Sequence, residues 1–201
     1  MVHIRHGEKV RKAVFPVAGM GTRFLPATKA SPKEMMAVVD KPLIQYAVEE
    51  AVEAGITEMI FVTGRTKRSI ADHFDKAYEL EHQLEQRGKK ELLAIAQNVV
   101  PKGVSCTYIR QTEALGLGHA VSTASHLVGD EPFAVILADD LIHYKKGAVR
   151  QMVETFEFYK SSVIAVQQVD GPDISSYGVI SGVKQTERVY LLDQIVEKPV
   201  F

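Results

Sequence analysis

Several residue types and segments that mark specialised proteins are scarce in this chain. Its 201 residues include no tryptophan and one cysteine, Cys106. A single cysteine excludes an intrachain disulfide and a cysteine-based metal cluster, and its apolar surroundings predict a buried, unreactive thiol. No apolar run approaches the roughly 18 residues that a membrane-spanning helix needs. The sequence therefore predicts a globular protein whose core needs no covalent cross-link.

An excess of one charge is also lacking. Lys and Arg total 24 against 25 Asp and Glu, a formal net charge of −1. This balance gives no bulk attraction to nucleic acid or to an anionic membrane, so we expect neither as a partner. The first residues, MVHIRHGEKVRK, lack the apolar segment of a secretory signal. We expect a cytoplasmic protein in which residues 1–11 form a short flexible arm.

Histidines offer no metal-binding pattern. The seven histidines show no spacing of the HExxH kind. We expect four of them on helix or loop surfaces: His73, His82, His126 and His143. Any metal site must then rely on carboxylates.

Strand-like and helix-like segments alternate along most of the chain. The apolar runs predict strands at 13–17, 58–63, 105–110, 133–137 and 162–169. Between them we expect helices at 42–54, 69–96, 118–127 and 148–160, the second being two helices broken near Gly88. Such alternation predicts a three-layer α/β fold with a mainly parallel sheet covered on both faces. Residues 178–183 and 189–198 follow with no helix between them, which predicts an antiparallel extension near the C-terminus.

The loop after the first strand is long and rich in glycine and proline. Gly19 and Gly21 allow the backbone to approach a ligand closely. A dinucleotide-binding turn would need a third glycine where Phe24 stands, and Pro26 prevents a helix from opening there. A P-loop would need Lys and Ser or Thr directly after its last glycine, and these are absent. The remaining signal is a glycine turn followed by three cations, Arg23, Lys29 and Lys33.

Three motifs in this loop resemble one family. Residues 19–23 read GMGTR, residues 25–29 read LPATK and residues 32–35 read PKEM. Together they resemble the bacterial UTP–glucose-1-phosphate uridylyltransferases, which belong to the sugar-nucleotide pyrophosphorylases. The resemblance implies a Rossmann-like nucleotidyltransferase fold and one catalytic domain over residues 1–201. It also implies the partners UTP, glucose 1-phosphate, UDP-glucose and pyrophosphate, with Mg²⁺ as cofactor.

The same resemblance assigns roles to individual residues. Arg23 and Lys33 would be catalytic, and Asp139, which follows the apolar run FAVIL, would bind the metal. A segment reading QTEALGLGHA at 111–120 resembles the family's base-recognition segment. The residues that would bind the nucleotide are Ala18, Gly19, Gly21, Thr22, Gln111 and Gly116. Those that would bind the sugar phosphate are Gly178, Glu197 and Lys198.

Members of that family continue beyond the position of Phe201, so we expect this chain to be truncated at its C-terminus. By resemblance, the absent part would hold a second metal carboxylate and the helices that make a homo-oligomer. We further expect the 201-residue chain to be weakly active or inactive.

Other functions remain open at this stage. A pyrophosphorylase of the dTDP-glucose or ADP-glucose type shares the GxGTR and PKE elements, although LPATK and EALGLGHA disfavour it. A glycosyltransferase would share the fold and a metal-bound carboxylate but would lack the Lys33 loop. A non-catalytic sugar-nucleotide-binding regulator is disfavoured because Arg23, Lys33, Asp139 and Lys198 are all present.

Overall fold

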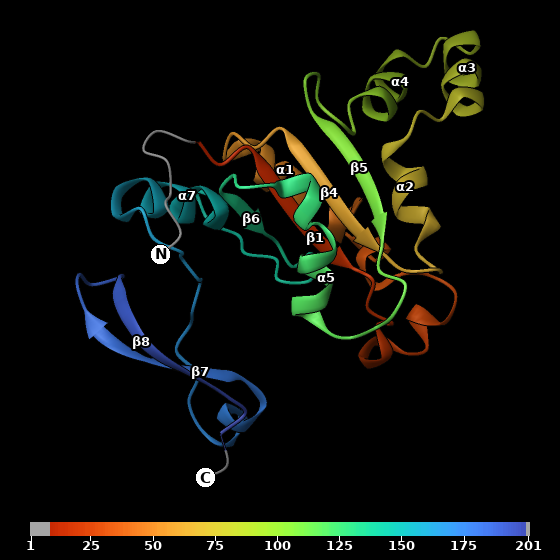
Figure 1. Cartoon of the computed structure of the whole chain (residues 1–201). Coiled ribbons are helices and arrows are strands. Elements are labelled where there is room, and N and C mark those ends of the chain that lie inside the picture. Colours follow the sequence, from red (N-terminus) through yellow and green to blue (C-terminus); the bar gives the residue numbers. More distant parts are fainter. Residues whose placement is uncertain (1–8, 200–201) are drawn as a thin grey trace. The chain divides into compact units, whose positions relative to one another are not determined.

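The computed structural model describes residues 9–199, which form two compact units (Figure 1). The first unit extends to Val163 and the second begins at Ile164. Most of the arm expected at 1–11 lies outside the described residues. Among those residues, no helix is both long enough and apolar enough to cross a membrane.

A four-stranded parallel sheet forms the centre of the first unit. Its strands are β1 (Lys12–Val17), β4 (Glu58–Thr63), β5 (Ser105–Arg110) and β6 (Phe133–Val135). They lie in the order β5-β4-β1-β6. Strand β1 pairs with β4 along its whole length, from Lys12 opposite Glu58 to Val17 opposite Thr63. The two central strands are buried almost continuously, as expected for parallel strands covered on both faces.

Side chains of the central strands alternate between two core layers. Phe15 and Phe61 face one layer, where their rings stack with centroids 4.9 Å apart. That layer also contains apolar residues of α1 (Leu43–Glu53), α2 (Arg68–Phe74) and α7 (Ala148–Tyr159). Val14 and Val62 face the opposite layer, which is covered by α5 (Leu117–Thr123) and α6 (Ser125–Val128). The expected three-layer α/β fold is confirmed.

Local boundaries differ from the sequence-based expectations in three places. The segment expected to hold two helices forms three, with α3 (Tyr78–Gln86) and α4 (Lys90–Gln97) following α2. The break at Gly88 is present, and a second break separates Phe74 from Tyr78. The helix expected at 118–127 is interrupted at Ala124. Strand β6 ends at Val135, although the Ile136 amide still donates to the Val14 carbonyl (3.0 Å).

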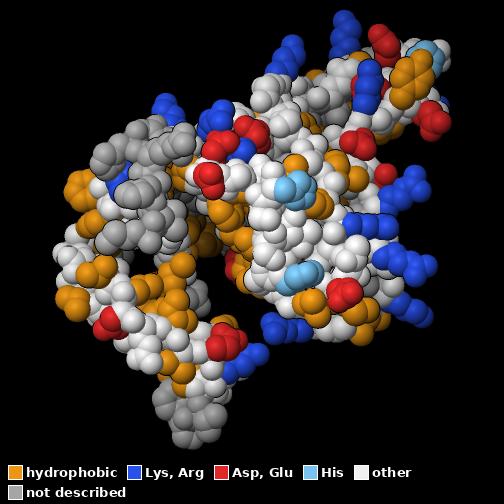
Figure 2. Space-filling view, viewed as in Figure 1, with side chains coloured by type: hydrophobic (Ala, Val, Ile, Leu, Met, Phe, Trp, Pro, Cys, Tyr) orange, Lys and Arg blue, Asp and Glu red, His pale blue; other side chains and the backbone are white. Residues whose placement is uncertain are grey.

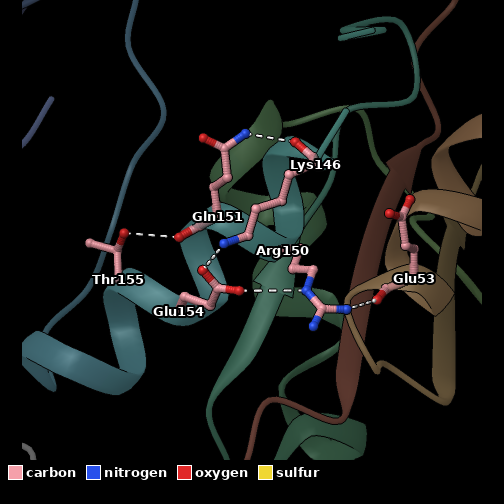
Figure 3. Close-up of polar contacts among 6 residues, drawn as sticks. All are labelled: Glu53, Lys146, Arg150, Gln151, Glu154 and Thr155. Atoms are coloured by element: carbon pink, nitrogen blue, oxygen red, sulfur yellow. Dashed lines mark hydrogen bonds and ion pairs between the residues drawn. The ribbon is translucent and has the colours of Figure 1, made fainter. Parts of the chain in front are cut away.

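Helix α7 is fixed against α1 by polar contacts in its first turn. The Glu50 carboxylate accepts a hydrogen bond from the Val149 amide (3.0 Å) and so binds a free N–H of the first turn. Arg150 donates to the Glu53 carbonyl (3.2 Å), and Glu154 forms ion pairs with Arg150 and Lys146 (Figure 3). These two cations lower the pKa of the exposed Glu154 carboxyl.

The strand order creates a topological switch between β1 and β6. From β1 the chain adds β4 and then β5 on one side, and β6 then pairs with the opposite side of β1. In open α/β sheets, ligands bind beyond the carboxyl ends of the strands at such a switch. The loop after β1 and the residues after β6 therefore flank the predicted site. Within that loop, β2 (Ala37–Val38) and β3 (Lys41–Pro42) form a short antiparallel pair.

The second unit is built on one antiparallel pair, β7 (Gly178–Lys184) and β8 (Tyr190–Glu197). This confirms the expected extension. The strand expected at 162–169 is wrong, because that segment has no strand conformation and no pairing partner among residues 9–199. β-branched side chains favour a strand only when a neighbouring strand and a packed face are available.

Candidate functional site

The loop after β1 is compact, with a sequence of short 3-10 turns. Gly21 has φ 66°, a left-handed conformation that suits glycine. Its carbonyl accepts a hydrogen bond from the Thr28 hydroxyl (2.7 Å). A Cβ at Gly21 would lie 3.3 Å from the Cβ of Lys33. The glycine therefore allows the stem of Lys33 to pack directly against the turn.

Two further glycines shape the surroundings of this loop. The position of a Cβ at Gly19 is open, with no atom within 4 Å. At the end of β4, a Cβ on Gly64 would lie 3.1 Å from the Ala18 carbonyl oxygen. Gly64 thus permits the loop backbone to lie against the neighbouring strand end, while Gly19 leaves its own stretch of backbone accessible to a ligand.

Lys33 and Asp139 meet across the switch between β1 and β6. The Lys33 ammonium lies 2.6 Å from Oδ2 of Asp139. The two side chains remain 21% and 34% exposed, so both can reach a ligand. Asp139 follows directly on the buried Ala138 at the end of the β6 segment. Two residues distant in sequence are therefore brought together.

Asp139 offers a carboxylate to a metal ion, but not a complete protein cage. No three His, Cys, Asp or Glu residues within 9–199 are grouped to hold a metal. Mg²⁺ commonly uses one or two carboxylates together with substrate phosphates, so Asp139 beside the open loop fits that type of site. Burial raises the pKa of the adjacent Asp140 carboxyl, and the charge of Asp139 adds to the effect.

Gln111 and Gly116 also come together, at the end of β5. The Gln111 side-chain amide donates to the Gly116 carbonyl (3.2 Å) and lies 2.9 Å from Nδ1 of His119. Gly116 has φ 95°, and no atom lies within 4 Å of the position of its Cβ. An amide side chain beside open backbone can recognise a base edge, because it offers both a donor and an acceptor.

The other candidate residues of the loop, a threonine and two cations, lie at the surface. Thr22, Arg23 and Lys29 are exposed, and Arg23 forms no ion pair within the described part of the chain. Basic side chains line the edge of the first unit where α2 and this loop lie (Figure 2). The local positive charge favours phosphate even though the whole chain is nearly neutral.

In the second unit, the hairpin register brings the three expected sugar-phosphate residues together. Gly178 pairs with Glu197, and a Cβ at Gly178 would lie 3.2 Å from Oε2 of Glu197. Lys198 has φ 46°, and its amide donates to the Tyr177 carbonyl (3.0 Å). Its ammonium lies 3.8 Å from Oε1 of Glu197, and both side chains are exposed.

Sequence reasoning missed one buried contact beside the loop. Lys67 lies 2.7 Å from Oε2 of Glu34, and the two side chains are only 3% and 1% exposed. Glu34 was visible within the PKEM motif, but nothing in the sequence indicated that it points inward. Lys67 follows a strand end in a polar segment and had no distinguishing signal.

Comparisons with known proteins agree in describing one family. A profile of the nucleotidyl transferase family matches residues 12–201. The chain is 52% identical to the UTP–glucose-1-phosphate uridylyltransferase YngB of Bacillus subtilis, over 96% of this chain and 64% of that protein. It is 50% identical to the UTP–glucose-1-phosphate uridylyltransferase of Pseudomonas aeruginosa, over 94% of this chain and 68% of that protein.

The fold is also similar to that of a UTP-bound UGPase from Acinetobacter baumannii. The TM-score is 0.89 at 44% identity, covering 95% of this chain and 68% of the other. The chain thus spans about two thirds of the length of the relatives that it matches.

Proposed function

Because the chain belongs to the nucleotidyl transferase family, we propose that it transfers a uridylyl group from UTP to glucose 1-phosphate. The products are UDP-glucose and pyrophosphate. The observation that carries this proposal is the contact of Lys33 with Asp139, in which Lys33 belongs to the loop whose Gly19 backbone is open to a ligand. A cation, a carboxylate and accessible backbone at a topological switch suit the binding of a nucleoside triphosphate.

In the proposed reaction, a phosphate oxygen of glucose 1-phosphate attacks the α-phosphorus of UTP. The new P–O bond forms as the bond to the β-phosphate oxygen breaks and pyrophosphate leaves. Such transfers depend on positioning and on neutralising charge, without a covalent enzyme intermediate. In this proposal Lys33 would bind a phosphate oxygen as a point charge, and the guanidinium of Arg23 would bind two oxygens at once.

We infer that Asp139 holds Mg²⁺ together with the phosphates. When bound, the ion neutralises charge on the phosphate oxygens. Ala18, Gly19, Gly21 and Thr22 would bind phosphate through the loop, and Gln111 and Gly116 would bind uracil. Gly178, Glu197 and Lys198 would bind glucose 1-phosphate, with Glu197 accepting hydrogen bonds from sugar hydroxyls.

The proposal also covers the domain organisation, cellular location and oligomeric state of the protein. We place both units in one catalytic domain that acts in the cytoplasm, and we expect the full-length protein to be a homo-oligomer. The names of the relatives support the choice of UTP and glucose 1-phosphate.

The direct test mixes the purified protein with Mg²⁺, glucose 1-phosphate and each nucleoside triphosphate in turn. Release of pyrophosphate and formation of the sugar nucleotide are then measured. We expect turnover with UTP to exceed turnover with dTTP, ATP or CTP. Faster turnover with dTTP or ATP would reassign the enzyme to another nucleotide sugar. Weak turnover is enough for this comparison. Tight binding of UTP in preference to the other triphosphates, even without pyrophosphate release, would match the low activity expected of this chain, whereas failure to bind UTP would contradict the proposal.

A further inference from the structure

Lys67 and Glu34 form an ion pair that is almost completely removed from solvent. Lys67 Nζ lies 2.7 Å from Glu34 Oε2, and the side chains are 3% and 1% exposed. By contrast, the Lys12–Glu131 pair leaves its carboxylate side chain 31% exposed. Oε1 of Glu34 is buried without a hydrogen-bond partner among the described residues. The contact therefore carries a large desolvation cost that is only partly offset.

The pair connects two segments that border the candidate site. Glu34 lies in the 3-10 turn over Lys33–Met35, next to the lysine that contacts Asp139. Lys67 precedes α2, and its amide donates to the carbonyl of Gly64 at the end of β4 (3.3 Å). The turn that carries Lys33 is thus joined to the sheet through a charged contact.

The two neighbouring side chains point in opposite senses. Glu34 is buried toward Lys67, whereas Lys33 is partly exposed and directed at Asp139. Backbone bonds brace the same turn, with the Met35 amide donating to Pro32 (2.9 Å) and the Met36 amide to Lys33 (3.1 Å). A rotation of this turn would move the Lys33 ammonium away from Asp139 even if the fold stayed intact.

A contribution to the stability of the fold does not by itself explain why both charges are buried here. Replacing a buried ion pair by apolar groups of similar volume is often neutral or stabilising, whereas removing one partner leaves an unpaired buried charge. A buried polar atom without a partner, such as Oε1 of Glu34, also calls for an explanation. Fixing one orientation of the turn supplies that explanation.

We propose that Glu34 and Lys67 are positioning residues that hold the turn carrying Lys33 against the end of β4. They set the place of the Lys33 ammonium without touching the substrate. This inference rests on the proposed function, in which Lys33 binds a phosphate oxygen during transfer. It assigns to the buried pair a part in the rate of the reaction rather than in the affinity for UTP.

The test uses the double variant Glu34→Gln/Lys67→Met, which removes both charges at nearly constant shape and so leaves no unpaired buried charge. We expect it to fold, with kcat lowered about 10- to 100-fold by the misplacement of Lys33. We expect KM for UTP to change by less than about threefold, because the variant keeps the contacts that bind UTP equally in the ground state and in the transition state. Amide exchange at Met35 and Met36 should become faster while exchange in α1 stays unchanged.

The control is Lys12→Met/Glu131→Gln, at the opposite end of β1. It removes the Lys12–Glu131 pair together with the Arg11–Glu131 pair and the bonds from Lys12 to the carbonyls of Leu127 and Val128. It should leave kcat and the exchange of the turn as in the parent chain. A double variant that folds and keeps both the parent kcat and slow exchange at Met35 would overturn the inference. A parent chain that neither binds UTP nor releases pyrophosphate would instead overturn the proposed function, and the inference with it.

Discussion

The two units assemble their candidate residues in different ways. In the first unit, Asp139 is distant in sequence from the loop that holds Gly21 and Lys33, and the two segments meet because β1 and β6 end at the same edge of the sheet. In the second unit, Gly178 and Glu197 meet because they are paired in one hairpin. The first arrangement depends on the whole core, whereas the second depends on the register of two strands.

The two sets of residues are therefore sensitive to different kinds of substitution. A change in the first unit can alter Lys33 through the packing of the loop or through the buried Glu34–Lys67 pair. A change in the second unit acts chiefly on the pairing of β7 with β8, because these strands have no third partner strand among residues 9–199. Substitutions in the two units should therefore be separable by experiment.

The largest effect should come from Lys33→Ala. Removal of a charge aimed at the transferring phosphate is expected to lower kcat about 10²- to 10³-fold, as loss of one preorganised electrostatic group commonly does. Lys90→Ala, at an exposed position that begins α4, is the matched control and should keep the parent kcat. Steady-state release of pyrophosphate measures both. A parent-like kcat for Lys33→Ala would remove this lysine from the reaction.

A smaller effect on the same site is expected from Asp139→Asn. Loss of one charge-assisted contact should raise the Mg²⁺ concentration for half-maximal turnover about 10- to 100-fold, corresponding to about 1.5–3 kcal/mol. Asp140→Asn is the comparison, because this neighbour has a raised pKa and no ion pair with Lys33 in the structure. The assignment fails if a metal titration shows the larger shift for Asp140→Asn.

The hairpin should respond on its own to Gly182→Ala. A Cβ at this bulge would lie 3.0 Å from the backbone carbon of Leu191 and from Cα of Leu192. Overpacking against backbone should destabilise the hairpin by about 1–3 kcal/mol. Hydrogen exchange should quicken in β7 and β8 and stay unchanged in β1 and β4. Val183→Ala, at the exposed next position, should change neither region.

The smallest expected effect is on the pH dependence of the stability of the first unit. His73, expected at the surface, is partly buried, lies 3.0 Å from Oε1 of Gln45 and packs against the ring of Phe74. Burial lowers the pKa of His73 below its ordinary value of 6.5. As the pH falls, the unfolded chain therefore protonates His73 at a higher pH than the folded chain does. The contribution of His73 to the free energy of unfolding is fully present above about pH 6.5, and it is lost as the pH falls through the lower pKa of the folded state.

His73→Gln should remove this contribution, and His82→Gln, at an exposed position, should keep it. Denaturant midpoints of the three proteins between about pH 5 and pH 7.5 measure the difference. If the denaturant midpoint changes with pH equally in His73→Gln and in the parent chain, burial of His73 does not affect stability as proposed.

The sequence predicted the elements whose patterns are strong locally. The runs at 58–63 and 105–110 match β4 and β5 residue for residue. Strand β4 is buried and mostly apolar, as expected for a central parallel strand. Strand β5 lies at the sheet edge, where exposed Ser105 and Thr107 alternate with the partly buried Cys106 and Tyr108. The hairpin was also predicted, since the strand-like segments 178–183 and 189–198 follow one another with no helical segment between them. Cys106 is half-buried rather than fully buried as expected, and this burial raises the pKa of its thiol to about 11, which agrees with an unreactive residue.

What the sequence could not predict depends on contacts between distant segments. The apolar run at 162–169 has strand composition, yet strand formation needs a partner that composition does not reveal. Glu34 and Lys67 carry charges that normally face water, and only the packed core shows that they face each other. The second break between α2 and α3 lies in a polar segment without glycine or proline.

The ion pair between Lys33 and Asp139 has a consequence for how a ligand enters. The site already balances its own charge before any phosphate arrives, since the ammonium faces a carboxylate at 2.6 Å. An incoming phosphate oxygen would exchange one anionic partner of Lys33 for another, and the released carboxylate would become free to accept a cation. Arrival of the triphosphate and recruitment of its counterion would then be two halves of one exchange.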